Sequence, residues 1–135
     1  QNEQALLDVT AARDALKGTG KIGVVGYCWG GLITWLAACR LDGFAAAVSY
    51  YGGGIGTVAG ETPRCPVLMH FGETDHAIPL TEVDKVRAAQ KGRAVEIHIY
   101  PAGHGFNCDQ RGSYHADSAT HARERTLAFF AKHVG

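Results

Sequence analysis

The sequence lacks the features that would direct it to a charged or membrane partner. Its 135 residues include 13 basic and 13 acidic side chains, so the formal net charge is zero. Without an excess of one sign, there is no field to attract nucleic acid or an anionic surface. The apolar runs, such as 45–48, are far shorter than the roughly 20 residues that cross a bilayer. We therefore expect no nucleic-acid partner, no membrane partner, and a small neutral or weakly charged ligand.

Patterns typical of metal sites and of disulfide frameworks are missing as well. The four cysteines form no CxxC pair, and the seven histidines show neither an HExxH pattern nor a clustered spacing with cysteine. Widely spaced cysteines in a chain of this size are typical of a reducing compartment. We therefore expect a cytoplasmic protein without a metal or another cofactor. The cysteines are Cys28, Cys39, Cys65 and Cys108.

The sequence has no repeat or long linker and instead alternates between helical and strand patterns. Unbroken apolar strands that alternate with helices are typical of a parallel sheet with helices on both faces. We therefore predict an α/β fold in one domain, with functional residues after the carboxyl ends of its strands. Segment 52–56, rich in glycine, predicts an irregular loop. The predicted helices cover 5–16, 32–41, 80–90 and 116–133, and the predicted strands cover 21–28, 45–51, 66–71 and 95–100.

The first strand end carries a candidate nucleophile. Cys28 lies in the run Gly26-Tyr27-Cys28-Trp29-Gly30-Gly31, whose glycines allow a tight strand-to-helix turn. Such a turn raises Cys28 above the sheet edge and directs helix amides toward it, with the Trp29 N–H as donor to an oxyanion. A buried structural cysteine is the plain alternative. A dinucleotide-binding loop is disfavoured because the glycines do not follow G-x-G-x-x-G.

Two later strand ends supply a carboxylate and a histidine. Asp75 lies in the turn after the third predicted strand, and His104 lies between glycines after the fourth. Each alone is an ordinary loop residue. With Cys28 they follow the nucleophile, acid, histidine order of the α/β-hydrolase triad. This order predicts that His104 takes the Cys28 proton, Asp75 orients His104, and the thiolate attacks an acyl carbon to form a thioester that water hydrolyses.

Several segments resemble the dienelactone hydrolase (carboxymethylenebutenolidase) family. Two features are specific to this family. One is a cysteine in the strand-to-helix turn, where most α/β hydrolases have serine, and the other is the histidine between glycines. The resemblance implies a partial α/β-hydrolase fold of about four parallel strands, and hydrolysis of an enol-lactone or related activated ester without a cofactor. Besides the run around Cys28, the similar segments are 71–75, 100–106 and 125–130.

The sequence departs from this family in two ways. An arginine that follows the histidine and binds the substrate carboxylate in the family is replaced by Asn107-Cys108-Asp109, and Arg111 is the nearest cation. Family members also have further strands before the nucleophile strand, so the resemblance implies that N-terminal strands, with a second oxyanion donor, are missing here. The 21–28 strand would then have an unpaired apolar edge, which predicts a homodimer along that edge or a longer parent chain.

The substrate pocket and the function leave alternatives open. A second candidate function is a binding or interaction module in which the triad is present but unassisted. A third is a Cys-His amidohydrolase resembling glutaminases, whose usual glutamate two residues after the histidine is replaced by Phe106. Residues near the strand ends are expected to wall the substrate site: Tyr27, Tyr50, Tyr51, Ile78 and Phe106.

Overall fold

A computed structural model describes all residues, 1–135, and confirms the predicted alternation of helices and strands. Two elements differ from the prediction. Helix α2 begins at Trp29, directly after Cys28, and not at residue 32. A short 3-10 helix, η1, begins at Ile55 inside the glycine-rich segment that was predicted to be irregular. The elements are α1 (Asn2–Ala15), β1 (Gly23–Tyr27), α2 (Trp29–Arg40), β2 (Ala46–Tyr50), η1 (Ile55–Val58), β3 (Val67–Gly72), α3 (Leu80–Ala89), β4 (Val95–Tyr100) and α4 (Ala116–His133).

The four strands form one parallel sheet in the order β1-β2-β3-β4. Every residue of β2 and β3 is buried, as expected for strands covered on both faces. The edge strands β1 and β4 are only partly buried. The register aligns Tyr27 with Tyr50, and Tyr50 with His70, so neighbouring strands end close together. The loops that leave β1, β2, β3 and β4 therefore meet at one edge.

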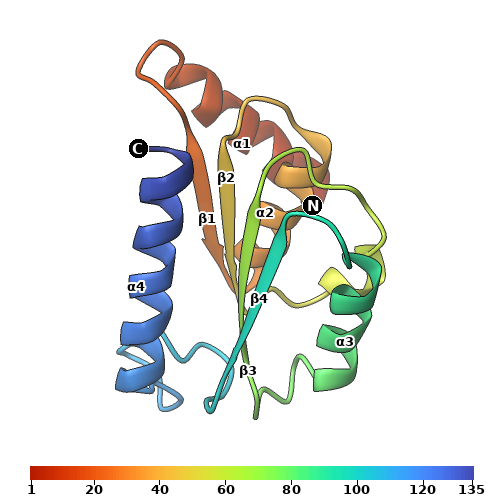
Figure 1. Cartoon of the computed structure of the whole chain (residues 1–135), viewed down its shortest axis with the longest axis vertical. Helices are drawn as coiled ribbons and strands as arrows, with labels where there is room; N and C mark the ends of the chain where they lie inside the picture. The colour runs from red at the N-terminus through yellow and green to blue at the C-terminus, as the bar shows by residue number, and fades with distance from the viewer.

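Helices cover both faces of the sheet, as the sequence predicts. Helix α2 packs on β1 and β2, α1 packs on α2, and α3 lies beside η1. Helix α4 lies alone against the opposite face, where it contacts β2 and β3 (Figure 1). The sheet therefore has one face toward α2 and one face toward α4. No helix is both long and apolar enough to pass through a bilayer.

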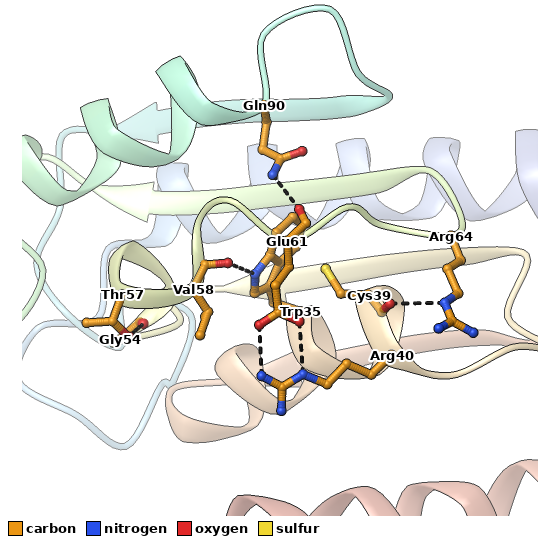
Figure 2. A network of polar contacts seen from close by, with 9 residues as sticks. All are labelled: Trp35, Cys39, Arg40, Gly54, Thr57, Val58, Glu61, Arg64 and Gln90. Carbon is orange, nitrogen blue, oxygen red and sulfur yellow. Dashed lines mark hydrogen bonds and ion pairs between the residues drawn. The ribbon is translucent and has the colours of Figure 1, made fainter.

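The connection between β2 and β3 is held in place by side chains of α2 and α3. Figure 2 shows this region, in which the buried Trp35 donates from its indole to the Val58 carbonyl at 3.1 Å. Gln90, directly after α3, donates to the Glu61 carbonyl at 2.8 Å. Arg40 and Glu61 form a paired ion bridge at 2.8 and 2.9 Å. These contacts fix a loop with little regular structure to the helices on both sides of it.

A buried polar network joins the sheet to α4. We call it the α4 network: Tyr50, His70, Tyr100 and Thr126. The His70 ring bonds the Tyr100 hydroxyl at 2.8 Å and the Thr126 hydroxyl at 2.9 Å, and Thr126 also bonds the Tyr50 hydroxyl at 2.9 Å. Burial, followed by the charges of His98 and Arg125, lowers the pKa of His70 to about 3. His70 is therefore neutral at physiological pH, and its two ring nitrogens supply one donor and one acceptor to the network.

Candidate active site

Cys28 occupies a strained backbone turn between β1 and α2. Its φ of 56° and ψ of −124° are rare for a residue with a side chain, and such strain is concentrated at functional sites. Gly26 is required by the turn, because a Cβ there would collide with the Gly30 carbonyl oxygen. A Cβ at Gly31 would lie 2.7 Å from the Tyr50 carbonyl oxygen, whereas one at Gly30 would meet nothing within 4 Å. Close contact between α2 and the ends of β1 and β2 therefore requires Gly26 and Gly31.

The start of α2 places backbone amides beside Cys28. Gly31 and Leu32 donate to the Cys28 carbonyl at 2.9 and 3.4 Å, which closes the first helical turn. Trp29 is the first residue of the helix, and its amide does not take part in that turn. Amides at a helix start are available to bind negative charge. The Trp29 side chain is half-exposed and donates to Asn2 at 3.0 Å, so only the backbone of Trp29 has the position expected of an oxyanion donor.

Asp75 is buried in the loop after β3 and is fully hydrogen-bonded. One carboxylate oxygen accepts from the amides of Ala77 and Ile78 at 2.8 and 3.1 Å. The other lies 2.7 Å from Nδ1 of His104. The Asp75 side chain has no exposed surface. A carboxylate held by two amides keeps its orientation, so Asp75 presents one fixed oxygen to His104.

His104 lies in the loop after β4, half-buried beside Asp75. Because an ionised carboxylate only accepts, Nδ1 carries the proton of this bond and Nε2 is left as an acceptor. The Ser113 hydroxyl donates to the His104 carbonyl and holds the loop from the other side. The structure thus pairs the predicted acid and histidine. The His104 ring bonds Asp75 and forms no hydrogen bond to the Cys28 thiol.

The expected pocket residues occupy different surroundings. Tyr27 is 46% exposed on β1, whereas Ile78 and Phe106 are buried. Tyr50 turns toward α4, where its hydroxyl bonds Thr126. Tyr51 turns toward the triad, with its ring centroid 5.3 Å from that of His104. The five residues therefore do not form one wall.

The structure adds one residue to the site that was noted in the sequence only as the nearest cation. Arg111 folds back on the loop that carries His104. A Cβ placed on Gly105 would lie 2.9 Å from an Nη atom of the Arg111 guanidinium. Arg111 takes part in none of the ion pairs of the protein. Its seven-residue separation from His104 gives no periodic signal, because the path of the loop decides where its side chain lies.

A cavity of about 280 Å³ lies behind the acid loop. It includes Gly52 and Ile78, and Glu82 is its only charged residue. Its remaining lining is largely apolar and comes from η1, β3, α3 and the loops that precede η1 and α3. None of the triad residues lines this cavity. No group of three or more His, Cys, Asp or Glu side chains is placed to hold a metal ion.

The parallel sheet covered by helices on both faces is an α/β-hydrolase fold. The strained Cys28 turn after β1, Asp75 after β3 and His104 after β4 follow the chain order of the triad in such hydrolases. The profile of the "Dienelactone hydrolase family" matches residues 1–134. The chain belongs to this family, as the resemblance in the sequence indicated.

Two relatives carry names that propose carboxymethylenebutenolidase activity. One, from Methylorubrum extorquens, is 34% identical over 96% of this chain and 51% of its own length. The other, from Escherichia coli K12, is 38% identical over 83% of this chain and 46% of its own length. The chain therefore spans about half the length of the relatives it matches.

Solved structures agree with the fold. A Klebsiella pneumoniae protein, whose name proposes a dienelactone hydrolase, superposes with a TM-score of 0.89 at 34% identity over 98% of this chain and 62% of its own. A Pyrococcus furiosus esterase superposes with a TM-score of 0.79 over 96% of this chain at 15% identity. The second likeness concerns the fold alone. It indicates that the sheet and its strand ends are common to hydrolases of different sequence.

Proposed function

We propose that this chain carries the catalytic residues of a cysteine hydrolase that cleaves an enol-lactone or a related activated ester through a thioester. The observation that carries the proposal is that the strained Cys28 turn and the hydrogen-bonded Asp75–His104 pair follow strands at the same edge of one parallel sheet. Membership of the dienelactone hydrolase family supports the same reaction class. The activity of the whole protein also depends on whatever residues lie outside this chain.

In the proposed reaction, Nε2 of His104 takes the Cys28 proton as Sγ attacks the carbonyl carbon. The negative charge moves to the carbonyl oxygen, where the Trp29 N–H donates to it. The carbon–oxygen bond of the ester then breaks, and His104 returns the proton to the leaving oxygen. Water, deprotonated by His104, attacks the thioester, and Sγ leaves to regain its proton. Asp75 holds His104 in the required tautomer throughout.

Arg111 is our candidate for binding an anionic group of the substrate. Its guanidinium lies against Gly105, beside the proposed base, and forms no ion pair within the protein. We therefore propose that it serves in place of the family arginine that Asn107-Cys108-Asp109 lacks. Tyr27, which is 46% exposed, remains our candidate for an apolar wall of the substrate site.

The direct test is covalent labelling of Cys28. Incubation with p-nitrophenyl acetate should add one acetyl group to the chain, detected by intact mass and mapped to Cys28. Cys28→Ala should remain unlabelled, whereas Cys108→Ala, which removes an exposed thiol of the site region, should still be labelled. Labelling that is the same in the wild type and in Cys28→Ala would overturn the hydrolase proposal and favour a binding module.

The substrate charge is tested with a pair of activated esters, one neutral and one carrying a distal carboxylate. Arg111→Gln should reduce the labelling rate with the anionic ester about 10-fold, since losing one charge-assisted contact typically costs about that much, and should leave the neutral ester unaffected. Equal losses with both esters would contradict the role of Arg111 in anion binding.

We also propose that two copies of this chain pair along β1. The strand has a neighbour on one side only, and Val25 is 42% exposed. Sedimentation should therefore detect a dimer, and Val25→Lys should shift it toward the monomer because a charge on an edge opposes pairing. A wild-type monomer at all concentrations would contradict this.

All four cysteines are free, which supports the proposed cytoplasmic location.

A further inference from the structure

Two residues other than glycine have a positive φ in this chain, and both follow strands at the site. One is Cys28, and the other is Tyr51, with a φ of 38°. An L-residue adopts this backbone at a cost, and such residues persist where the surroundings hold them in place. The turn at Cys28 is explained by the tight connection between β1 and α2, which carries the proposed nucleophile. The turn at Tyr51 therefore needs its own explanation.

The turn brings the Tyr51 side chain against the loop that carries the proposed base. We call residues 104–107 the histidine loop. The Tyr51 ring lies 5.3 Å from the His104 ring and 5.2 Å, edge to face, from the Phe106 ring. The Asn107 backbone, near the Tyr51 hydroxyl, lowers the pKa of Tyr51 against the larger effect of burial. The Tyr51 ring therefore packs against two residues of the histidine loop, His104 and Phe106.

Tyr51 is itself held tightly. Its own amide donates to the His70 carbonyl at 2.7 Å, and its side chain is 1% exposed. Burial, followed by the nearby Cys28 thiol, raises the pKa of Tyr51, so the hydroxyl stays protonated. A group buried to this degree offers little surface to a substrate. It does offer a rigid face to its neighbours.

The adjacent Tyr50 provides a contrast within the same strand end. It is as buried as Tyr51, at 2% exposed, but its hydroxyl bonds Thr126 in the α4 network. The two tyrosines thus have similar side chains and different partners, although their rings lie 5.9 Å apart. Only Tyr51 contacts the histidine loop.

We propose that Tyr51 is a positioning residue that clamps the histidine loop and sets the plane of the His104 ring, in place of the substrate-wall role expected from the sequence. This inference rests on the proposed function of Cys28 and His104. The bond from Asp75 to Nδ1 holds one edge of the imidazole, and the Tyr51 ring packs beside the imidazole with 59° between the two ring planes. Together the two contacts direct Nε2 toward the Cys28 end of the site.

The consequence concerns the rate of the chemical step. Displacing a reacting group by about 1 Å can cost about 100-fold in rate. Loss of the clamp should therefore slow the transfer of the Cys28 proton without weakening substrate binding. A residue that forms the pocket wall would instead change the substrate concentration at half-maximal rate.

The experiment compares three variants of the full chain in the acylation of Cys28 by p-nitrophenyl acetate, followed by mass at several ester concentrations and pH values. Tyr51→Leu, which removes the aromatic face, should lower the maximal acylation rate by about 10- to 100-fold, with the half-saturating ester concentration unchanged. Tyr51→Phe keeps the ring and loses only the hydroxyl, so its loss should be smaller. Tyr50→Phe is the matched control and should acylate at the wild-type rate.

A second readout does not depend on acylation. The imidazole nitrogens of His104, observed by NMR, should give one sharp set of signals in the wild type, in Tyr50→Phe and in Tyr51→Phe, which keeps the ring, and broadened or doubled signals in Tyr51→Met, which does not. Tyr51→Met replaces Tyr51→Leu if the leucine variant does not fold, as judged by circular dichroism. The NMR readout also separates the two proposals, because unlabelled wild-type Cys28 would overturn the hydrolase function alone. Several sets of His104 signals in the wild type, unchanged His104 signals in Tyr51→Met, or a loss confined to half-saturation in Tyr51→Leu would overturn the clamp.

Discussion

Polar side chains on the two faces of the sheet edge differ in hydrogen bonding and in backbone strain. On the α4 face, Tyr50 and His70 are buried and hydrogen-bonded, and both belong to regular strands. On the triad face, Cys28 and Tyr51 have strained backbone, and His104 keeps a nitrogen without a partner. The polar side chains of the α4 face all have hydrogen-bond partners, whereas on the triad face Nε2 of His104 has none.

This difference indicates a division of labour at one set of strand ends. Saturated buried networks are rigid and specify a single arrangement of the core. Strain and unpaired polar atoms are tolerated only where the surrounding structure holds them. The α4 network therefore supplies the rigidity that the triad face requires. Changes on the triad face should affect chemistry, and changes on the α4 face should affect stability.

The largest expected effect is on the triad face. Asp75→Asn keeps the shape of the side chain but can donate to Nδ1, which favours the wrong tautomer of His104. We expect the rate of Cys28 acylation by p-nitrophenyl acetate to fall by about 1,000-fold or more. Glu73→Gln, an equivalent change at an exposed position of the same loop, is the control and should leave the rate within about two-fold of the wild type. Equal rates for the two variants would remove Asp75 from the triad.

The second effect is on the α4 face. Thr126→Val removes the hydroxyl that joins Tyr50 to His70 and leaves both buried groups short of a partner. The free energy of unfolding, measured in urea, should fall by about 1–3 kcal/mol. Thr126→Ser keeps the hydroxyl and should lose less. Acylation of Cys28 below the unfolding transition should stay close to the wild-type rate in both variants, and a large loss of rate would contradict the division of labour.

The α4 network should also make stability depend on pH. The pKa of His70 is lowered in the folded protein to about 3 from an ordinary value of 6.5, so the unfolded chain binds this proton more readily. The stability that the neutral ring contributes is therefore complete above pH 6.5 and is lost as pH falls toward about 3. The slope is at most about 1.4 kcal/mol per pH unit. Urea unfolding across this range should show a shallower slope for His70→Gln, and an equal slope in both proteins would contradict the assignment.

The smallest effect is expected away from both faces. Arg40 and Glu61 form a paired bridge at the surface, with side chains 44% and 30% exposed. Such pairs contribute about 0.2–1 kcal/mol because water and salt screen them. Arg40→Gln should therefore destabilise the protein by less than Thr126→Val, and the loss should shrink in high salt. A loss that exceeds that of Thr126→Val would show that the β2–β3 connection matters more than the α4 network.

Local sequence pattern predicts where the edge strands β1 and β4 lie along the chain. It does not predict how exposed they are to solvent. Apolar runs with β-branched residues predict β1 as readily as β2. Their burial differs because β2 has a neighbour on each side and β1 has one. Pairing is a property of the assembled sheet and leaves no signal within a single strand.

Much of the candidate site could be predicted from the sequence because its residues directly follow strands. Glycines around Cys28, a carboxylate after β3 and a histidine after β4 are local signals, and parallel topology places such positions at one edge. The order of elements, the family and the pairing of Asp75 with His104 all follow from these signals. The reactivity of the three residues stays a prediction until Cys28 is labelled.

Only the tertiary structure decided which way each side chain turns. Tyr50 and Tyr51 are neighbours of the same type, and nothing in the sequence separates them. A positive φ sends Tyr51 to the histidine loop, while the strand geometry sends Tyr50 to Thr126, 76 residues away in the chain. Arg111 likewise reaches Gly105 through the path of its loop. Local pattern determines which elements form, whereas side-chain contacts between distant segments depend on how those elements pack.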